Sequence, residues 1–171
     1  MKIAIIGYSG SGKSTLARKL AEKYHIDVLH FDAVQFKPNW EIRSDVVKKK
    51  MTQVFMDIHD SWVIDGNYSK LYFDRRMEEA DEIILLQFNR FSCFYRAWRR
   101  SKVYADKTRP DMGDGCKEKF DLEFMKWILW KGRTKETKER YRSVVKSYPQ
   151  KVTVIKNQKQ LDRYIQSVAV E

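Results

Sequence analysis

The chain has 171 residues, of which 43% are hydrophobic and 33% charged, and these values fit one globular domain and exclude wholesale disorder. Lysine and arginine outnumber acidic residues by 34 to 23, so the net charge of +11 indicates either polyanionic partners or simply a basic surface. Two cysteines exclude a disulfide scaffold and suggest reduced thiols in a cytoplasmic protein. Neither a signal peptide nor a membrane-spanning apolar run is expected, and no membrane partner is predicted.

Strands and helices are predicted to alternate along the chain. Short apolar runs predict strands over 2–6, 27–31, 61–65, 82–88 and 151–155. Apolar residues at helical spacing predict helices over 13–24, 42–58, 91–101, 121–147 and 160–168. The second of these helices carries its apolar residues on one face: Val47, Met51, Val54, Phe55 and Ile58.

This alternation implies parallel strands joined by right-handed crossovers. No linker, repeat or low-complexity tract interrupts the pattern, so the chain is interpreted as one α/β domain over 1–171. The stretch over 102–120 has no clear period and contains Pro110, Gly113 and Gly115, which favours a loop or mobile flap.

The sequence "GYSGSGKS", Gly7 to Ser14, fits the phosphate-binding pattern G-x-x-x-x-G-K-[ST] and lies between a predicted strand and a predicted helix. Glycines let the backbone wrap closely around phosphate, and the helix N-terminus favours an anion. We expect Lys13 to reach the β- and γ-phosphates of ATP, Ser14 to bind Mg²⁺, and Thr15 to contact a phosphate oxygen. The residues expected to hold the nucleotide here are Gly7, Ser9, Gly10, Ser11, Gly12, Lys13, Ser14 and Thr15.

Two carboxylates are predicted at strand ends, where ligands bind in open parallel sheets. Asp32 closes "VLHFD" and Asp65 closes "SWVID". A carboxylate in such a place can hold Mg²⁺ through water or accept the proton of an acceptor hydroxyl. The alternative is that each caps the turn or helix that follows.

The helix expected over 91–101 is rich in arginine. From Arg90 to Arg109 there are seven basic residues and one acid. Arg96 and Arg100 share one helix face at i, i+4, where like charges repel and a bound phosphate would relieve the repulsion. They are therefore candidates for stabilising the charge that develops during phosphoryl transfer, with a solvated basic face as the alternative.

Taken together, these residues resemble the adenylate-kinase-like branch of the P-loop proteins, the nucleoside and nucleotide kinases. The stretches "HFDAVQFKPNW", "VIDGNY", "TRPDM" and "EFMKWILW" are similar to the small proteins known as DNA topology modulation proteins. The resemblance implies a three-layer α/β/α fold with a five-stranded parallel sheet in the order 2-3-1-4-5 and a small lid over 102–120.

The same resemblance implies roles for single residues. Asp65 would organise Mg²⁺, Arg96 and Arg100 would be the two lid arginines, and Asn157, in the loop over 156–158, would border the adenine. The sequence has no T-G-D-x-x-R-like stretch, and Tyr68 stands where adenylate kinases have proline.

Three hypotheses for function follow. The first is an ATP- and Mg²⁺-dependent kinase of a small acceptor such as a nucleoside or nucleotide, with Lys13, Asp32, Arg96 and Arg100 as catalytic residues and Ser14 and Asp65 at the metal. The second is a nucleotide-dependent DNA-binding protein whose positive charge follows the DNA backbone. The third is a P-loop protein that binds ATP without chemistry.

Overall fold

A computed structural model describes residues 1–105, 107–113 and 115–170. Its core is one parallel sheet of five strands in the order β2-β3-β1-β4-β5, which confirms the predicted order. Positions 106 and 114 of the predicted lid lie outside the described residues. The strands are β1 (Lys2–Gly7), β2 (Asp27–His30), β3 (Trp62–Asp65), β4 (Glu82–Leu86) and β5 (Val152–Ile155).

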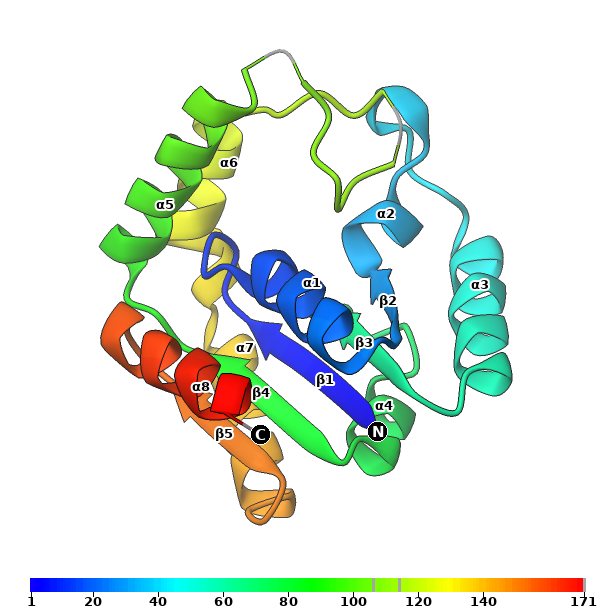
Figure 1. Cartoon of the computed structure of the whole chain (residues 1–171). Helices are drawn as coiled ribbons and strands as arrows, with labels where there is room; N and C mark the ends of the chain where they lie inside the picture. The colour runs from blue at the N-terminus through cyan, green and yellow to red at the C-terminus, as the bar shows by residue number, and fades with distance from the viewer. Residues whose placement is uncertain (106, 114, 171) are drawn as a thin grey trace.

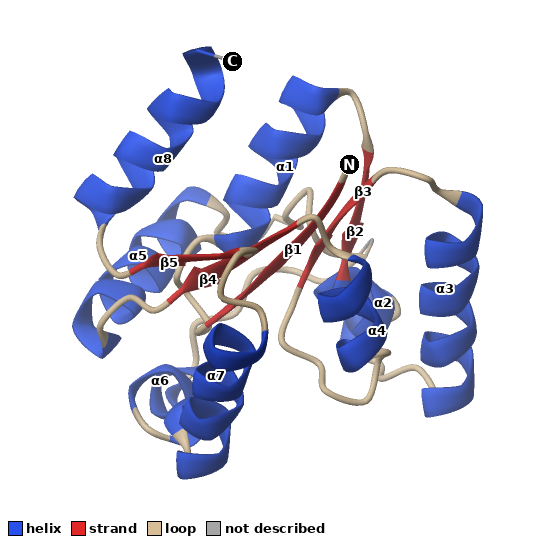
Figure 2. Cartoon of the chain, turned by 90° about the horizontal axis from the view of Figure 1, so that it is seen from below, coloured by secondary structure: helices blue, strands red, loops and turns tan. Residues whose placement is uncertain are grey.

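Helices cover both faces of the sheet, as expected for strands with continuous apolar runs. Helices α1 and α8 lie on one face and α4 and α7 on the other, while α3 lies beyond the β2 edge (Figure 1 and Figure 2). No helix among the described residues is long and apolar enough to cross a membrane. The helices are α1 (Lys13–Tyr24), α2 (Phe31–Gln35), α3 (Asp45–Ile58), α4 (Phe73–Glu79), α5 (Arg90–Val103), α6 (Leu122–Leu129), α7 (Lys135–Ser147) and α8 (Gln158–Val170).

Strand β1 occupies the centre of the sheet, and its apolar side chains have no exposed surface. The register places Ile5 beside Asp65 of β3, and His30 of β2 beside the same residue. Gly7 lies beside Leu86 of β4. Because the strands are parallel, their carboxyl ends meet at one edge, where the predicted phosphate-binding loop begins.

The prediction of a single long helix over 121–147 is wrong. It divides into α6 and α7, with a 3₁₀ turn, η2 (Lys131–Arg133), between them. Trp130 leaves helical geometry, and the Thr134 hydroxyl accepts a hydrogen bond from the Thr137 amide, which starts α7 as a new helix. The stretch over 131–140 contains no apolar residue, so the prediction had joined two separate apolar segments across the break.

Helix α3 also differs from its prediction. It begins at Asp45 rather than at Ile42, because the Ser44 side chain caps it by accepting from the Val47 amide. An apolar helix face usually turns towards the core. Here most of the predicted face is exposed, and the buried positions of the helix are Lys48, Thr52 and Met56.

Two short helices were not predicted, and one of them moves a candidate residue. Asp32 does not end strand β2 but lies in the first turn of α2, a helix of only five residues. Helix α4, of seven residues, begins after Tyr72 in left-handed backbone conformation. Both helices are too short to show a hydrophobic period in the sequence.

Candidate active site

The loop between β1 and α1 has the backbone of a phosphate cradle. Gly7 and Gly10 adopt φ of +143° and +77°, values that favour glycine. A Cβ on Gly7 would lie 2.3 Å from the Leu86 carbonyl oxygen, and one on Gly10 would lie 2.5 Å from that of Cys93. Neither position has room for a side chain, so the loop is packed tightly against β4 and α5.

Polar groups of the cradle are consistent with an anionic ligand. The Ser11 hydroxyl is buried and has no hydrogen-bond partner among the described residues, so a phosphate oxygen would satisfy it. Ser9 Oγ accepts a hydrogen bond from Trp127 Nε1 of α6 at 3.0 Å. Thr15 is exposed in the first turn of α1. The backbone shape and the unpartnered Ser11 hydroxyl are chemically suited to a phosphate group.

Lys13 starts α1 and folds back over the loop. Its Nζ donates to the Tyr8 carbonyl oxygen at 3.1 Å. Burial lowers the pKa of Lys13 below its ordinary value, while the charges of Asp32 and Asp65 act in the opposite direction. The side chain therefore lies within electrostatic reach of both predicted carboxylates.

Asp65 lies at the end of β3, as predicted, and holds two neighbours. Its Oδ2 accepts from the Ser14 hydroxyl at 2.8 Å, and its Oδ1 is hydrogen-bonded to His30 Nδ1. Burial alone would lower the pKa of His30, but the hydrogen bond and charge of Asp65 raise it above its ordinary value. The sequence analysis did not predict this contact between His30 and Asp65.

Asp32, in α2, faces Tyr68, which lies in the loop after β3. The Tyr68 hydroxyl donates to Asp32 Oδ1 at 2.8 Å. Burial of the phenol and the nearby carboxylate raise the pKa of Tyr68 well above its ordinary value, so the phenol stays protonated and donates. This hydrogen bond joins Asp32, the carboxylate predicted to face the acceptor hydroxyl, to the loop that follows Asp65.

Arg96 lies directly beside the cradle. Its guanidinium occupies the space into which a Cβ on Gly12 would point, stacks 4.8 Å from the Phe88 ring, and donates to Gln158. Burial lowers the pKa of Arg96. Asn157, which precedes Gln158 in the predicted adenine loop, caps α8 because its side chain accepts a hydrogen bond from the Gln160 amide at 3.0 Å.

Arg100 is held by an acidic residue of the lid. Its Nε donates to Glu118 Oε1 at 2.8 Å, and Arg109 pairs with the other oxygen of the same carboxylate at 2.6 Å. Arg109 also pairs with Asp111 at 2.7 Å. Burial, and then the charge of Arg109, lower the pKa of Arg100. The sequence analysis did not predict the role of Glu118, because it considered only the cationic residues of this region as candidates.

The lid reaches across to the segment after α2. Trp40 Nε1 donates to the Lys117 carbonyl oxygen at 3.0 Å, and the Cys116 thiol lies 3.1 Å from the Lys37 carbonyl oxygen. In Figure 1 the lid extends from the end of α5 across to the segment that follows α2. The lid thus connects the α5 side of the predicted site, which carries Arg96, to the α2 side, which carries Asp32.

Arg76 was missed by the sequence analysis and shapes the loop after β3. It is fully buried, and its guanidinium donates to three carbonyl oxygens, those of Leu71, Gly66 and Tyr68. It also stacks 4.4 Å from the Phe31 ring. Burial lowers the pKa of Arg76 to about 9. One buried cation thereby fixes the turn that presents Tyr68.

A cleft of about 600 Å³ is lined in part by Tyr68. Polar and aromatic side chains from several elements line it, among them Gln35, Lys48, Asn67 and Trp127. The Asn67 amide donates to the Tyr141 hydroxyl at 2.6 Å, while its Oδ1 is buried without a hydrogen-bond partner among the described residues. This cleft has the size and the open acceptor to take a small polar ligand.

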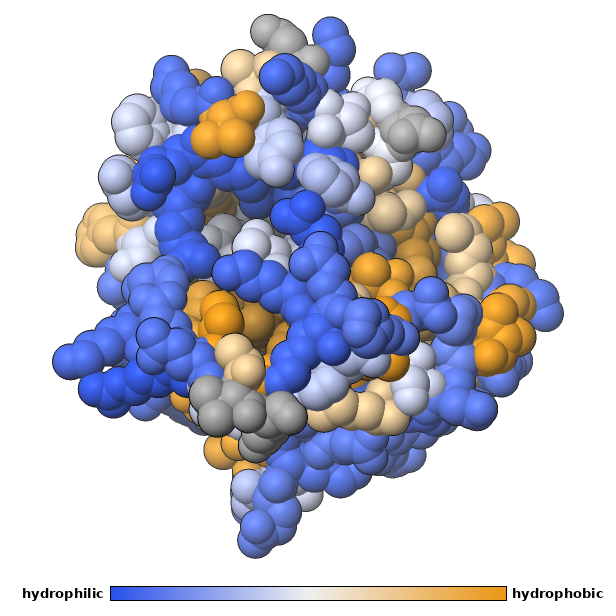
Figure 3. All heavy atoms as spheres, in the orientation of Figure 1, coloured by the Kyte–Doolittle hydropathy of each residue, from blue (hydrophilic) through white to orange (hydrophobic). Residues whose placement is uncertain are grey.

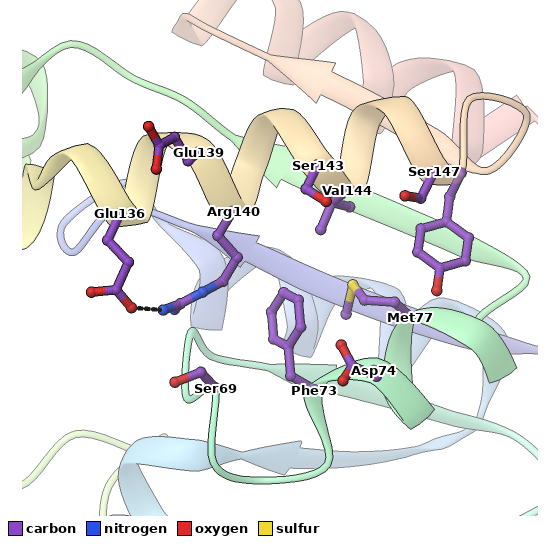
Figure 4. A pocket seen from close by; sticks show the side chains of 11 residues that line it. Ser69, Phe73, Asp74, Met77, Glu136, Glu139, Arg140, Ser143, Val144 and Ser147 are labelled. Carbon is purple, nitrogen blue, oxygen red and sulfur yellow. Dashed lines mark hydrogen bonds and ion pairs between the residues drawn. The ribbon is translucent and has the colours of Figure 1, made fainter.

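A second cleft, of about 530 Å³, lies between α4 and α7. In Figure 4, Phe73 and Met77 of α4 face Val144 of α7, and Arg140 pairs with Glu136 at the rim. None of the predicted site residues lines it, so the chemistry expected from the sequence is not placed there.

Comparisons with known proteins support this fold. No protein-family model matches the chain. A search of curated proteins finds no match either. Among solved structures the chain is similar to that of deoxyadenosine kinase from M. mycoides with products dCMP and a flexible dCDP bound, with a TM-score of 0.51 and 13% identity over 100% of both chains. The chain therefore shares its overall fold with this kinase structure.

Proposed function

We propose that the chain is an ATP- and Mg²⁺-dependent phosphotransferase acting on a small acceptor such as a nucleoside or nucleotide. The observation that carries the proposal is the hydrogen bond from Ser14 to Asp65, at the start of α1 and beside Lys13. A hydroxyl and a carboxylate joined next to a phosphate cradle form the pair that P-loop enzymes use around Mg²⁺. The structural similarity to a nucleoside kinase supports the same class.

The metal would rest on few protein groups. Among the described residues there is no cluster of three or more histidine, cysteine or acidic side chains able to hold a metal ion. Mg²⁺ commonly keeps several waters and takes one or two protein ligands plus substrate phosphates. Ser14 and Asp65 fit that requirement, and the bound ion would neutralise phosphate charge.

Each of the remaining side chains has a role in this proposal. Lys13 and Arg96 stabilise charge on the transferring phosphoryl group, and Arg100 joins them when it leaves Glu118. Asp32 accepts the proton of the acceptor hydroxyl, while Tyr68 holds the carboxylate in place. The cleft lined in part by Tyr68 would hold the rest of the acceptor.

The test is an acceptor screen with ATP and Mg²⁺, run beside a direct ATP-binding measurement. We expect one class of nucleosides or nucleotides to be phosphorylated, and Asp32→Asn to lose the transfer while still binding ATP. Asp60→Asn is a matched control, because Asp60 is exposed at the surface. A protein that binds ATP but phosphorylates no acceptor would contradict the proposal.

A second candidate is nucleotide-dependent DNA binding, and one observation favours it. Helix α5 contains five cationic residues and no acid, and Phe91, Tyr95 and Trp98 are exposed on it. Exposed rings beside cations can stack bases and contact phosphates. Binding of DNA that weakens steeply with salt and differs between ATP and ADP would support this function, and salt-insensitive binding would remove it.

A further inference from the structure

The outward face of α3 is apolar and uncovered. Val47, Met51, Val54 and Ile58 are exposed by 45%, 38%, 39% and 69%. Figure 3 shows orange side chains at the right edge of the molecule, where α3 lies in Figure 1, and no other described element lies beyond the helix there. Four neighbouring apolar side chains on one helix form a patch that usually marks an interaction surface.

The spacing of this patch is that of a helix pair. The four residues follow one another at intervals of four, three and four, which is the seam of a two-helix coiled coil. The inner side of the same helix is separately occupied, because Thr52 and Met56 are buried against the rest of the chain. The outer seam is therefore not needed for the protein's own core.

We propose that a second copy of this chain docks on α3, with the two α3 helices antiparallel across a two-fold axis. In that arrangement Met51 packs against Val54 of the second copy, and Val47 packs against its Ile58. The same contacts are repeated in both halves, as a two-fold interface requires.

Charges beside the seam select the antiparallel direction. Lys50 and Asp57 lie on the same edge of the seam, one near each end of α3. Antiparallel helices bring Lys50 of one copy beside Asp57 of the other, twice, whereas parallel helices would place Lys50 beside the uncharged Phe55. Asp57 already pairs with Arg75 at 2.8 Å through one oxygen, and a carboxylate can accept at both.

The interface would be small, and it would lie close to the candidate site. A helix of 14 residues is about 21 Å long, so the pair would bury less than a standard interface of about 1,600 Å². We therefore expect a dimer that dissociates on dilution. Asp45 and Lys48 of the same helix line the larger cleft, so docking would hold one wall of that cleft.

The first test is sedimentation equilibrium of the full chain from about 1 to about 100 µM, a range suited to a small interface. We expect a mass that rises from 20.5 kDa towards twice that value. Val54→Glu should remain monomeric at every concentration. Val145→Glu is the matched control, since Val145 of α7 is 37% exposed, and it should associate like the parent chain. A parent chain that stays monomeric, or equal association of both variants, would overturn the proposal.

The second test examines direction by disulfide cross-linking. Val47→Cys and Ile58→Cys variants, mixed and oxidised, should form a mixed dimer, because the two positions face each other in the antiparallel pair. Ile58→Cys alone should not cross-link, since its two copies would be about 16 Å apart along the seam, beyond the reach of a disulfide. Native Cys93 and Cys116 are buried and do not compete. Efficient cross-linking of Ile58→Cys alone would refute the antiparallel arrangement.

Discussion

The two sides of the candidate site are built in different ways. The phosphate loop and α1 take their backbone shape from glycines and short-range bonds, such as that from Lys13 to Tyr8, five residues earlier, although Ser9 and Ser14 also bond to distant residues. The side formed by α2, α3 and the lid depends on distant side chains, since Tyr68 and Asp32 are 36 residues apart and Trp40 and Lys117 are 77 apart. A local sequence pattern therefore predicts the backbone of the first side, whereas no local pattern predicts the contacts that assemble the second.

The largest expected effect is on the first side. Lys13→Met should lower phosphotransfer about 10³-fold, because it removes a charge aimed at the transferring group. The same change should leave the melting temperature unchanged or higher, since the lysine charge is desolvated in the folded protein. Steady-state kinetics and thermal unfolding check the two results separately. Unchanged transfer would show that Lys13 does not act on the phosphoryl group.

A pair of glycine substitutions compares the two sides directly. Gly7→Ala should cost about 3 kcal/mol of unfolding free energy, because the new Cβ would strike the Leu86 carbonyl oxygen at a φ of +143°. Gly113→Ala in the lid should cost no more than about 1 kcal/mol, since the nearest atom, the Phe36 carbonyl oxygen, is 3.2 Å away. Urea denaturation measures both. Equal costs would contradict the difference in tightness between the two sides.

Glu118→Gln tests whether side-chain pairs hold the lid. The change removes the charge that pairs with both Arg100 and Arg109, and should cost about 2 kcal/mol. We expect hydrogen exchange to become faster in the lid and to stay unchanged in β1. Glu139→Gln is the control, because its pair with Lys135 is exposed and 3.8 Å long and should contribute under about 0.5 kcal/mol. Unchanged exchange in the lid would rule out the proposed role of Glu118.

The smallest effect is expected at Tyr68. Tyr68→Phe removes the hydrogen bond to Asp32 and should raise KM for the acceptor about 5- to 10-fold, the value of one lost hydrogen bond. KM for ATP should not change, because the phosphate loop is untouched. Tyr95→Phe, at an exposed position of α5, serves as the control. An equal rise in both KM values would place Tyr68 on the ATP side instead.

The sequence alone determined the centre of the molecule. Continuous apolar strands, the glycine pattern and the helix over 13–24 are local features, and a local pattern can specify them because backbone conformation and near neighbours decide their shape. The strand order implied by the family resemblance is confirmed as well. Asp65 lies at the end of its strand, as the apolar run before it predicted.

Tertiary structure decided what local patterns leave open. Arg76 is buried under the loop after β3, and Glu118 binds two arginines, although each sits in an ordinary charged stretch of the sequence. The apolar face of α3 could equally have packed on the core or faced outward. The helix has two usable faces, and the packing of Thr52 and Met56 settles which one is inside. Periodicity measures the amphipathic character of a helix, but the partner of each face is fixed only when the whole chain folds.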